Sequence, residues 1–153
     1  MIKYADTKVV FQEIPDRVSL AINITNCQQN CKGCHSPYLR GNNGTVMTFA
    51  ELDELIKRNQ GINCVLFMGE GNDREALISV ANYIHKNYNG INTALYSGRE
   101  DVEDDIYEVF DYVKIGPYME DRGSLDKRTT NQRLYRINRD GSRDDITHRF
   151  WAQ

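Results

Sequence analysis

Short apolar segments that predict strands alternate along the chain with amphipathic segments that predict helices. The expected strands cover residues 18–24, 62–68, 91–96 and 112–115, each short and rich in aliphatic or aromatic side chains. Strands that are separated by a helix need a crossover connection, and such crossovers join parallel strands in a right-handed sense. The chain is therefore expected to have an α/β fold with a mostly parallel sheet.

The helical segments carry their own start and stop signals. Thr48 and Glu51 form a capping box, which predicts a helix of about 12 residues that stops at Gly61. Asn72 is expected to cap a second helix, and apolar residues at helical spacing predict a third over residues 102–110. Each expected helix thus lies between two expected strands.

The length of the chain limits how such a sheet can close. The sequence has 153 residues, of which 40% are hydrophobic, so a single domain over residues 1–153 with one core is expected. A complete (β/α) barrel takes about 250 residues. With one more strand predicted near residues 134–137, we expect a partial (β/α) barrel of about five or six mostly parallel strands, open on one side.

The charge balance excludes some classes of partner. The 19 basic and 22 acidic residues give a formal net charge of −3, which is not the footprint of a protein that binds nucleic acid in bulk. No segment approaches the about 20 apolar residues of a membrane span, and the polar N-terminus lacks the core of a signal peptide. We expect a cytoplasmic protein that binds neither nucleic acid nor membranes.

Three of the four cysteines form the most informative motif. Cys27, Cys31 and Cys34 make a C-x3-C-x2-C array directly after the first predicted strand. In a reducing compartment such clusters hold metals more often than they form disulfides. A [4Fe–4S] cluster normally has four thiolate ligands, so three would leave one iron with an open position at which a substrate can bind.

The alternative is a structural zinc site in a non-catalytic interaction module. His35 or the remote Cys64 would then supply the fourth ligand of a closed tetrahedron. Two features count against this alternative. His35 is adjacent to Cys34, an awkward spacing for two ligands of one ion, and Cys64 lies in an apolar segment where a free cysteine usually acts as a core residue.

The cysteine array, with Gly33 before its last cysteine, resembles that of the radical S-adenosylmethionine (SAM) enzymes. The chain is most similar to the small activating proteins of anaerobic ribonucleoside-triphosphate reductase. Weaker similarities are the strand before the array and three short motifs after it, which are Gly69-Glu70-Gly71, Ser97-Gly98 and Asn131-Gln132. Together these features span most of the chain.

The resemblance implies a cofactor, a reaction and a partner. Cys27, Cys31 and Cys34 would hold a [4Fe–4S] cluster whose fourth iron binds SAM. An electron from a donor such as flavodoxin or ferredoxin would cleave SAM reductively, and the resulting 5′-deoxyadenosyl radical would take a hydrogen atom from a glycine of the large subunit of anaerobic ribonucleoside-triphosphate reductase. Activation of another glycyl-radical enzyme, or radical chemistry on a small molecule, is the alternative within the same superfamily.

The resemblance also implies SAM-binding residues, namely Gly33, Gly69, Glu70, Gly71, Ser97 and Gly98. The family usually has two glycines followed by an acid where this chain has Met68 before Gly69, so the register differs here. Glycine permits close backbone approach and a carboxylate accepts hydrogen bonds from an ammonium group. The simpler alternatives are an ordinary turn for residues 69–71 and a helix N-cap for Ser97.

Overall fold

A computed structural model describes residues 1–25 and 44–151. Strands and helices alternate through the middle of the chain, and further strands precede and follow that region. In chain order the elements are β1 (Lys3–Val10), β2 (Ser19–Ile24), β3 (Thr45–Val46), α1 (Phe49–Arg58), β4 (Cys64–Met68), α2 (Arg74–Asn87), β5 (Asn92–Tyr96), α3 (Asp104–Val109), β6 (Tyr112–Ile115), β7 (Arg133–Ile137), β8 (Arg143–Asp145) and the 3-10 helix η2 (Thr147–Phe150).

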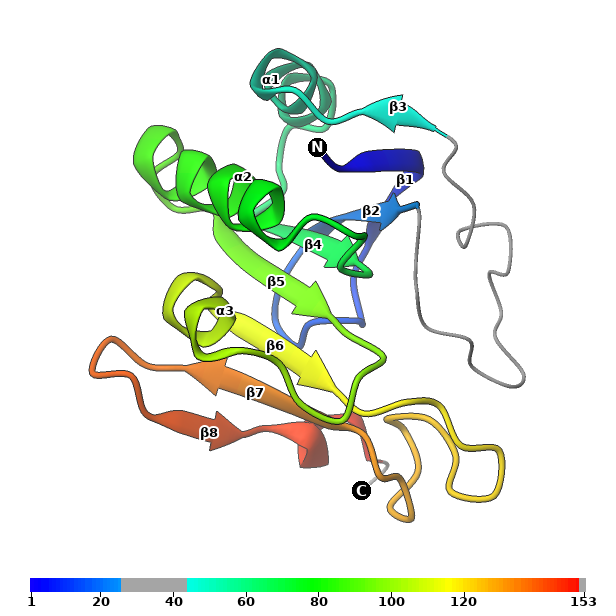
Figure 1. Ribbon diagram of the computed structural model, residues 1–153. Helices are drawn as coiled ribbons and strands as arrows, with labels where there is room; N and C mark the ends of the chain where they lie inside the picture. Colours follow the sequence, from blue (N-terminus) through cyan, green and yellow to red (C-terminus); the bar gives the residue numbers. More distant parts are fainter. Residues whose placement is uncertain (26–43, 152–153) are drawn as a thin grey trace.

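The strands form one open sheet in the order β3-β1-β2-β4-β5-β6-β7-β8. Its centre consists of four parallel strands, β2, β4, β5 and β6. The flanking strands pair antiparallel with their neighbours. Figure 1 shows α1, α2 and α3 following one another along the same side of the sheet. The carboxyl ends of the parallel strands therefore all lie at one edge.

The α/β class is confirmed, and the sheet is open, as expected. A partial (β/α) barrel of five or six mostly parallel strands is not confirmed, because the described residues form eight strands and only three of the seven neighbouring pairs are parallel. The unexpected strands lie at or near the edges, where both faces carry polar residues. β8, for example, is exposed along its whole length, so it lacks the apolar alternation that reveals a half-buried strand.

Capping groups fix where the first two helices begin. The Thr48 hydroxyl accepts a hydrogen bond from the Glu51 N–H at 3.0 Å, which confirms the predicted capping box. The predicted cap of α2 at Asn72 is wrong by one residue. Asp73 caps α2 instead, because its carboxylate accepts from the Ala76 N–H three positions later, at 3.1 Å. None of the helices in the described ranges has the length and apolar character needed to cross a membrane.

The main core lies between the sheet and the three helices. Strand residues in direct register form an apolar row across the parallel strands, made of Ile22, Phe67, Leu95 and Val113. All four side chains are fully buried. The ring of Phe67 also meets the ring of Phe110 edge to face, with 6.0 Å between the ring centroids. Phe67 therefore joins the sheet to the segment that follows α3.

A second core covers the opposite face of the same strands. Its strand residues alternate with those of the first core and include Ala21, Leu66, Ala94 and Tyr112. None of the described helices α1, α2 and α3 contributes a residue to this core. Ile14 and Leu125, from the loops before β2 and after β6, cover this face instead. The two cores thus sandwich a sheet that is buried on both sides at its centre.

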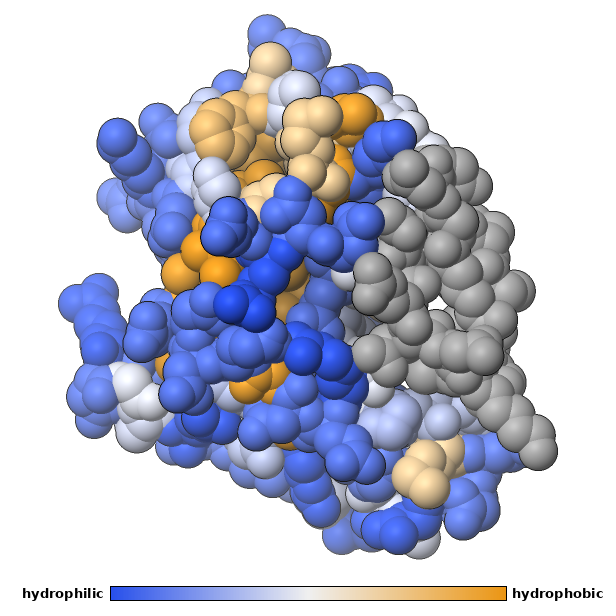
Figure 2. Space-filling model, in the orientation of Figure 1, coloured by the Kyte–Doolittle hydropathy of each residue, from blue (hydrophilic) through white to orange (hydrophobic). Residues whose placement is uncertain are grey.

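Apolar side chains are also partly exposed on the helical side. Figure 2 shows them gathered over α1 and α2. Phe49 at the start of α1 is 43% exposed and its ring stacks on that of Tyr83 in α2, with 4.2 Å between the centroids and 11° between the planes. The stacking fixes the two helices against each other at their surface.

Replacing Phe67 with Ala is expected to lower the free energy of unfolding by about 3–5 kcal/mol, because a fully buried ring leaves a cavity that the neighbouring strands cannot fill. The matched control is Phe11→Ala. Phe11 is 66% exposed, so its loss should change the stability by no more than about 0.5 kcal/mol. Urea unfolding followed by circular dichroism measures both values, and equal losses would contradict the assignment of Phe67 to the core.

Candidate functional site

The three predicted cluster ligands, Cys27, Cys31 and Cys34, lie outside the described residues, as do Gly33 and His35. The description stops at Thr25, one residue after the carboxyl end of β2. Within the described ranges, no group of three or more His, Cys, Asp and Glu side chains is placed to hold a metal ion. The thiolate ligands therefore remain a prediction from the sequence.

The turn after β4 contains the next predicted segment. Gly69 and Gly71 both have a positive φ, of 107° and 70°, a backbone region that favours glycine. A Cβ on Gly71 would lie 3.1 Å from the Cγ2 atom of Ile24. The missing side chain thus lets this turn pack closely against the carboxyl end of β2, and Glu70 projects from between the two glycines.

The segment after β5 meets that turn through one hydrogen bond. The Ser97 hydroxyl donates to Oε2 of Glu70 at 2.5 Å, and Ser97 is almost completely buried. Its N–H donates to the carbonyl of Lys114 at 2.8 Å, which extends the β5–β6 pairing by one residue. Gly98 follows directly. Two of the predicted SAM-binding segments, 27 residues apart in sequence, therefore lie side by side.

The alternative role for Ser97, as the N-cap of the next helix, is wrong. α3 begins only at Asp104, and Glu103 occupies its N-cap position without a side-chain cap. The Ser97 hydroxyl instead accepts from the N–H of Arg99 at 3.1 Å. It closes a local turn and holds Glu70 at the same time.

Arg99 completes this cluster, and the sequence analysis missed it. Its Nε donates to Oε2 of Glu70 at 3.0 Å and its Nη2 donates to Oε1 at 2.6 Å. Nη2 also donates to the carboxylate of Glu103. These hydrogen bonds, first of all the one to Glu70, raise the pKa of Arg99. We call Glu70, Ser97 and Arg99 the carboxylate cluster.

A buried lysine lies beside the carboxylate cluster, on the face of the sheet that the helices do not cover. Nζ of Lys114 donates to the carbonyls of Ser97 at 3.1 Å and Gly116 at 3.0 Å. Lys114 is only 8% exposed. A lysine inside the otherwise apolar segment Tyr112–Ile115 is the sequence signal that could have revealed it, because lysine is almost never buried without partners.

Lys114 also lines a cavity of about 420 Å³ on this face. Tyr96, its neighbour in register, forms another part of the wall. The Tyr96 hydroxyl donates to the carbonyl of Glu13, and burial raises the pKa of Tyr96. The remaining lining residues come from the loop before β2, from the loop between β6 and β7 and from η2: Gln12, Glu13, Tyr118, Ser124, Leu125, Asp126, Gln132 and Phe150.

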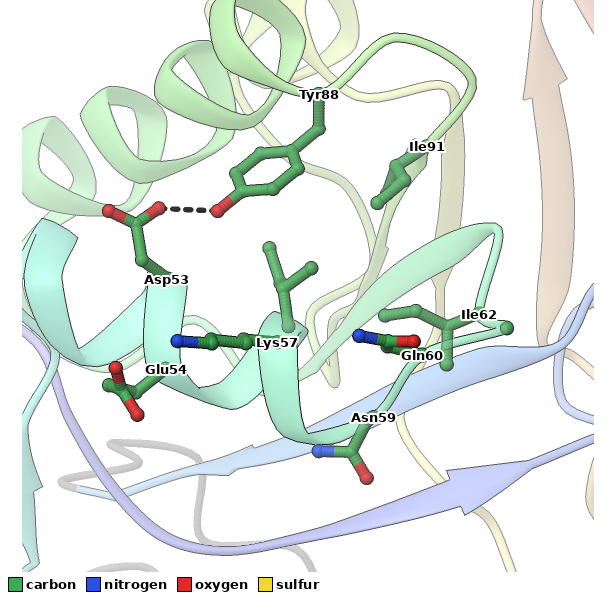
Figure 3. Close-up of a pocket in the computed structure, with 10 residues that line it drawn as sticks. Asp53, Glu54, Lys57, Asn59, Gln60, Ile62, Tyr88 and Ile91 are labelled. Carbon is green, nitrogen blue, oxygen red and sulfur yellow. Dashed lines mark hydrogen bonds between the residues drawn. The ribbon is translucent and has the colours of Figure 1, made fainter.

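A different hollow, of about 600 Å³, lies beside α1 near the amino ends of β4 and β5. Figure 3 shows that the carboxylate of Asp53 within it points at the hydroxyl of Tyr88. Tyr88 and Tyr83 donate to this carboxylate at 2.5 and 2.8 Å. The hydrogen bond to Asp53 is the largest cause that raises the pKa of Tyr88, to about 12. These groups stabilise a helix contact, and the hollow is at the opposite end of the strands from the carboxylate cluster.

Comparison of the chain with protein-family models, with characterised proteins and with solved structures found no significant match. Function is therefore inferred from the chemistry and the positions of the residues. The carboxyl edge of the parallel strands combines an oriented carboxylate between two glycines of positive φ with a cavity walled by a lysine and a tyrosine. Such an edge is where open α/β folds bind their ligands.

Gly116 fixes the geometry behind the carboxylate cluster. Its N–H donates to the carbonyl of Arg99 at 2.6 Å, and its own carbonyl accepts from Lys114 and from Gln132. Its φ is 102°, and a Cβ there would lie 3.0 Å from the Cα atom of Gln132 and 3.2 Å from the carbonyl oxygen of Asn131. Neither the Asn131 nor the Gln132 backbone can move away from Gly116 without displacing the segment beside the carboxylate cluster.

Gly116→Ala is expected to destabilise the protein by about 1–3 kcal/mol more than Gly90→Ala, because only the first adds a side chain to an occupied space. Gly90 is the matched control, since its φ is 88° and a Cβ there would meet nothing within 4 Å. Both substitutions place an alanine in the left-handed backbone region, which destabilises each variant by about 1–2 kcal/mol. Thermal unfolding of the two variants measures the difference, and equal stabilities would show that the close approach at Gly116 is not tight.

Proposed function

We propose that the chain is a radical SAM activase, which reductively cleaves SAM at a [4Fe–4S] cluster and generates a glycyl radical on anaerobic ribonucleoside-triphosphate reductase. One observation carries the proposal. The C-x3-C-x2-C array begins two residues after Thr25 in the sequence, and the strand that ends before Thr25 packs at its carboxyl end against the turn that presents Glu70. In the sequence, the motif thus follows directly after the strand that packs against the turn of Glu70.

The carboxylate cluster fits the amino group of SAM. A carboxylate has about four lone-pair positions that accept hydrogen bonds. Among the described residues, Ser97 and Arg99 together occupy three positions on Glu70, since Oε2 accepts two hydrogen bonds and Oε1 accepts one from Arg99. The remaining position on Oε1 is available to an ammonium group. Gly69 and Gly71, on either side of Glu70, hold the turn close to the carboxyl end of β2.

The cluster and SAM, when bound, supply the electron transfer and the radical chemistry, and the residues of this chain hold and shield them. Cys27, Cys31 and Cys34 would hold the cluster. Glu70, with Gly69, Gly71, Ser97 and Gly98 around it, would bind the amino-acid end of SAM, and Gly33 would let the cysteine segment approach it.

The cavity beside Lys114 favours a macromolecular substrate within this proposal. It lies at the carboxyl half of the strands, on the face without helices, and its wall is made partly of loop residues. The open sheet leaves this side of the strands without the remaining wall of a complete barrel. A glycine-bearing segment of a partner protein could enter there and be shielded from water.

The position of Cys64 argues against the alternative of a zinc-stabilised module with Cys64 as fourth ligand. Cys64 pairs in register with Ser19, the first residue of β2, whereas the array follows the last. Ser19 and Thr25 are six positions apart, and an extended chain of that length spans about 20 Å. Cys64 is fully buried, and burial raises its pKa to about 12, so its thiol stays protonated and acts as a core group.

Replacing any one of Cys27, Cys31 and Cys34 with Ala is expected to abolish both iron binding and SAM cleavage, because a [4Fe–4S] cluster with two protein thiolates is not retained. Iron and sulfide analysis after anaerobic reconstitution measures the first effect, and detection of methionine and 5′-deoxyadenosine under dithionite measures the second. Cys64→Ala is the matched control. It should keep the cluster and cost only packing energy, on the order of 1 kcal/mol.

Loss of iron in Cys64→Ala would contradict this ligand assignment. Colourless wild-type protein that retains one zinc ion would contradict the proposal that the chain is a radical SAM enzyme. Brown protein that fails to cleave SAM under strong reductant would leave an iron–sulfur site without the proposed activity.

Activation of the reductase is tested by electron paramagnetic resonance. Anaerobic mixing of the reduced, cluster-loaded protein with SAM and the large reductase subunit from the same genome should give the doublet of a glycyl radical. Omission of SAM is the control and should give no doublet. A doublet that forms only on a different glycyl-radical enzyme would identify the partner as that enzyme, and SAM cleavage without a radical on any such protein would favour a small-molecule substrate.

A further inference from the structure

We infer that Arg99 is a positioning residue that orients the Glu70 carboxylate for the amino group of SAM, an inference that rests on the proposed function. Arg99 itself does not need to touch SAM. It acts through the carboxylate, whose two oxygens it holds with two N–H groups.

The geometry of the pair fixes the plane of the carboxylate. Nε and Nη2 of Arg99 meet different oxygens of Glu70, at 3.0 and 2.6 Å, and a guanidinium is a rigid planar fork. The Ser97 hydroxyl adds a third donor at 2.5 Å. A carboxylate held by three donors on two oxygens cannot rotate freely, so its remaining acceptor position points in one direction.

Arg99 is itself held from several sides. Its N–H donates to the Ser97 hydroxyl at 3.1 Å, and its carbonyl accepts from the N–H of Gly116 at 2.6 Å. Its Nη2 also pairs with Glu103 at the start of α3. The backbone of Arg99 is thus fixed by two hydrogen bonds and its guanidinium by Glu103, as suits a group that pre-organises a binding site.

Arg99 can contribute to folding as well as to the site. The Arg99 side chain is 35% exposed and that of Glu70 17% exposed, and a two-pronged Arg–carboxylate pair within a charge network is among the ion pairs that stabilise a fold. The effect of Arg99 on ligand affinity is therefore measured on variants whose unfolding midpoint is also known.

The chain offers a matched control in Arg74. Its Nη1 pairs with Glu103 at 2.8 Å and its Nε with Asp105 at 3.1 Å, so it belongs to the same row of charges as Arg99. Arg74 makes no hydrogen bond or ion pair with Glu70 within the described ranges. Arg74→Gln removes the same charge from the same neighbourhood but leaves the carboxylate cluster intact.

The test measures the dissociation constant of SAM by equilibrium dialysis with anaerobically reconstituted protein and no reductant, so that no turnover occurs. We expect Arg99→Gln to weaken SAM binding about tenfold, the typical effect of losing a charge-assisted hydrogen bond. Arg99→Lys should lose less, because it keeps the charge beside Glu70, and Arg74→Gln should stay within about twofold of wild type. Iron content and thermal unfolding show that each variant is folded and loaded.

The double variant separates an action through Glu70 from direct contact with SAM. If Arg99 acts through the carboxylate, adding Arg99→Gln to Glu70→Gln should weaken binding no further than Glu70→Gln alone. Losses that multiply would overturn the inference, and so would an Arg99→Gln affinity equal to that of Arg74→Gln. Loaded wild-type protein that binds no SAM would overturn the proposed function and the inference together, an outcome that the wild-type measurement alone identifies.

Discussion

The register of the four parallel strands is the constraint on which the rest of the structure depends. β2, β4, β5 and β6 pair residue by residue, so their carboxyl ends reach the same edge of the sheet. Segments that follow different strands therefore meet there, which is why Glu70 and Ser97 form a hydrogen bond. The carboxylate cluster is in this respect a consequence of strand alignment.

The order of the parallel strands also explains how the sheet face opposite the helices is covered. Strand order advances in one direction through the parallel strands, and the three helices all pack on one side. The opposite side is apolar at its centre and must be covered by something else. Ile14, Leu125 and Phe150 cover it from loops and from η2, and the cavity beside Lys114 lies where this cover is incomplete.

The sequence predicted the centre of this fold better than its edges. The four parallel strands and the start of α1 at Thr48 lie within two residues of their predicted positions, because buried strands and capped helices have strong local signals. β1 was missed, since polar residues such as Asp6 interrupt its alternation. Arg99 was missed for a different reason: its partner Glu70 is 29 residues away, and only the strand register brings the two together.

Ser97 connects the carboxylate cluster with the cavity on the other face of the sheet. Its hydroxyl donates to Glu70 in the carboxylate cluster, and its carbonyl accepts from Lys114 on the cavity side. A buried residue with partners on both sides cannot move without disturbing both. The carboxylate cluster and the cavity are therefore connected through the side chain and the carbonyl of Ser97.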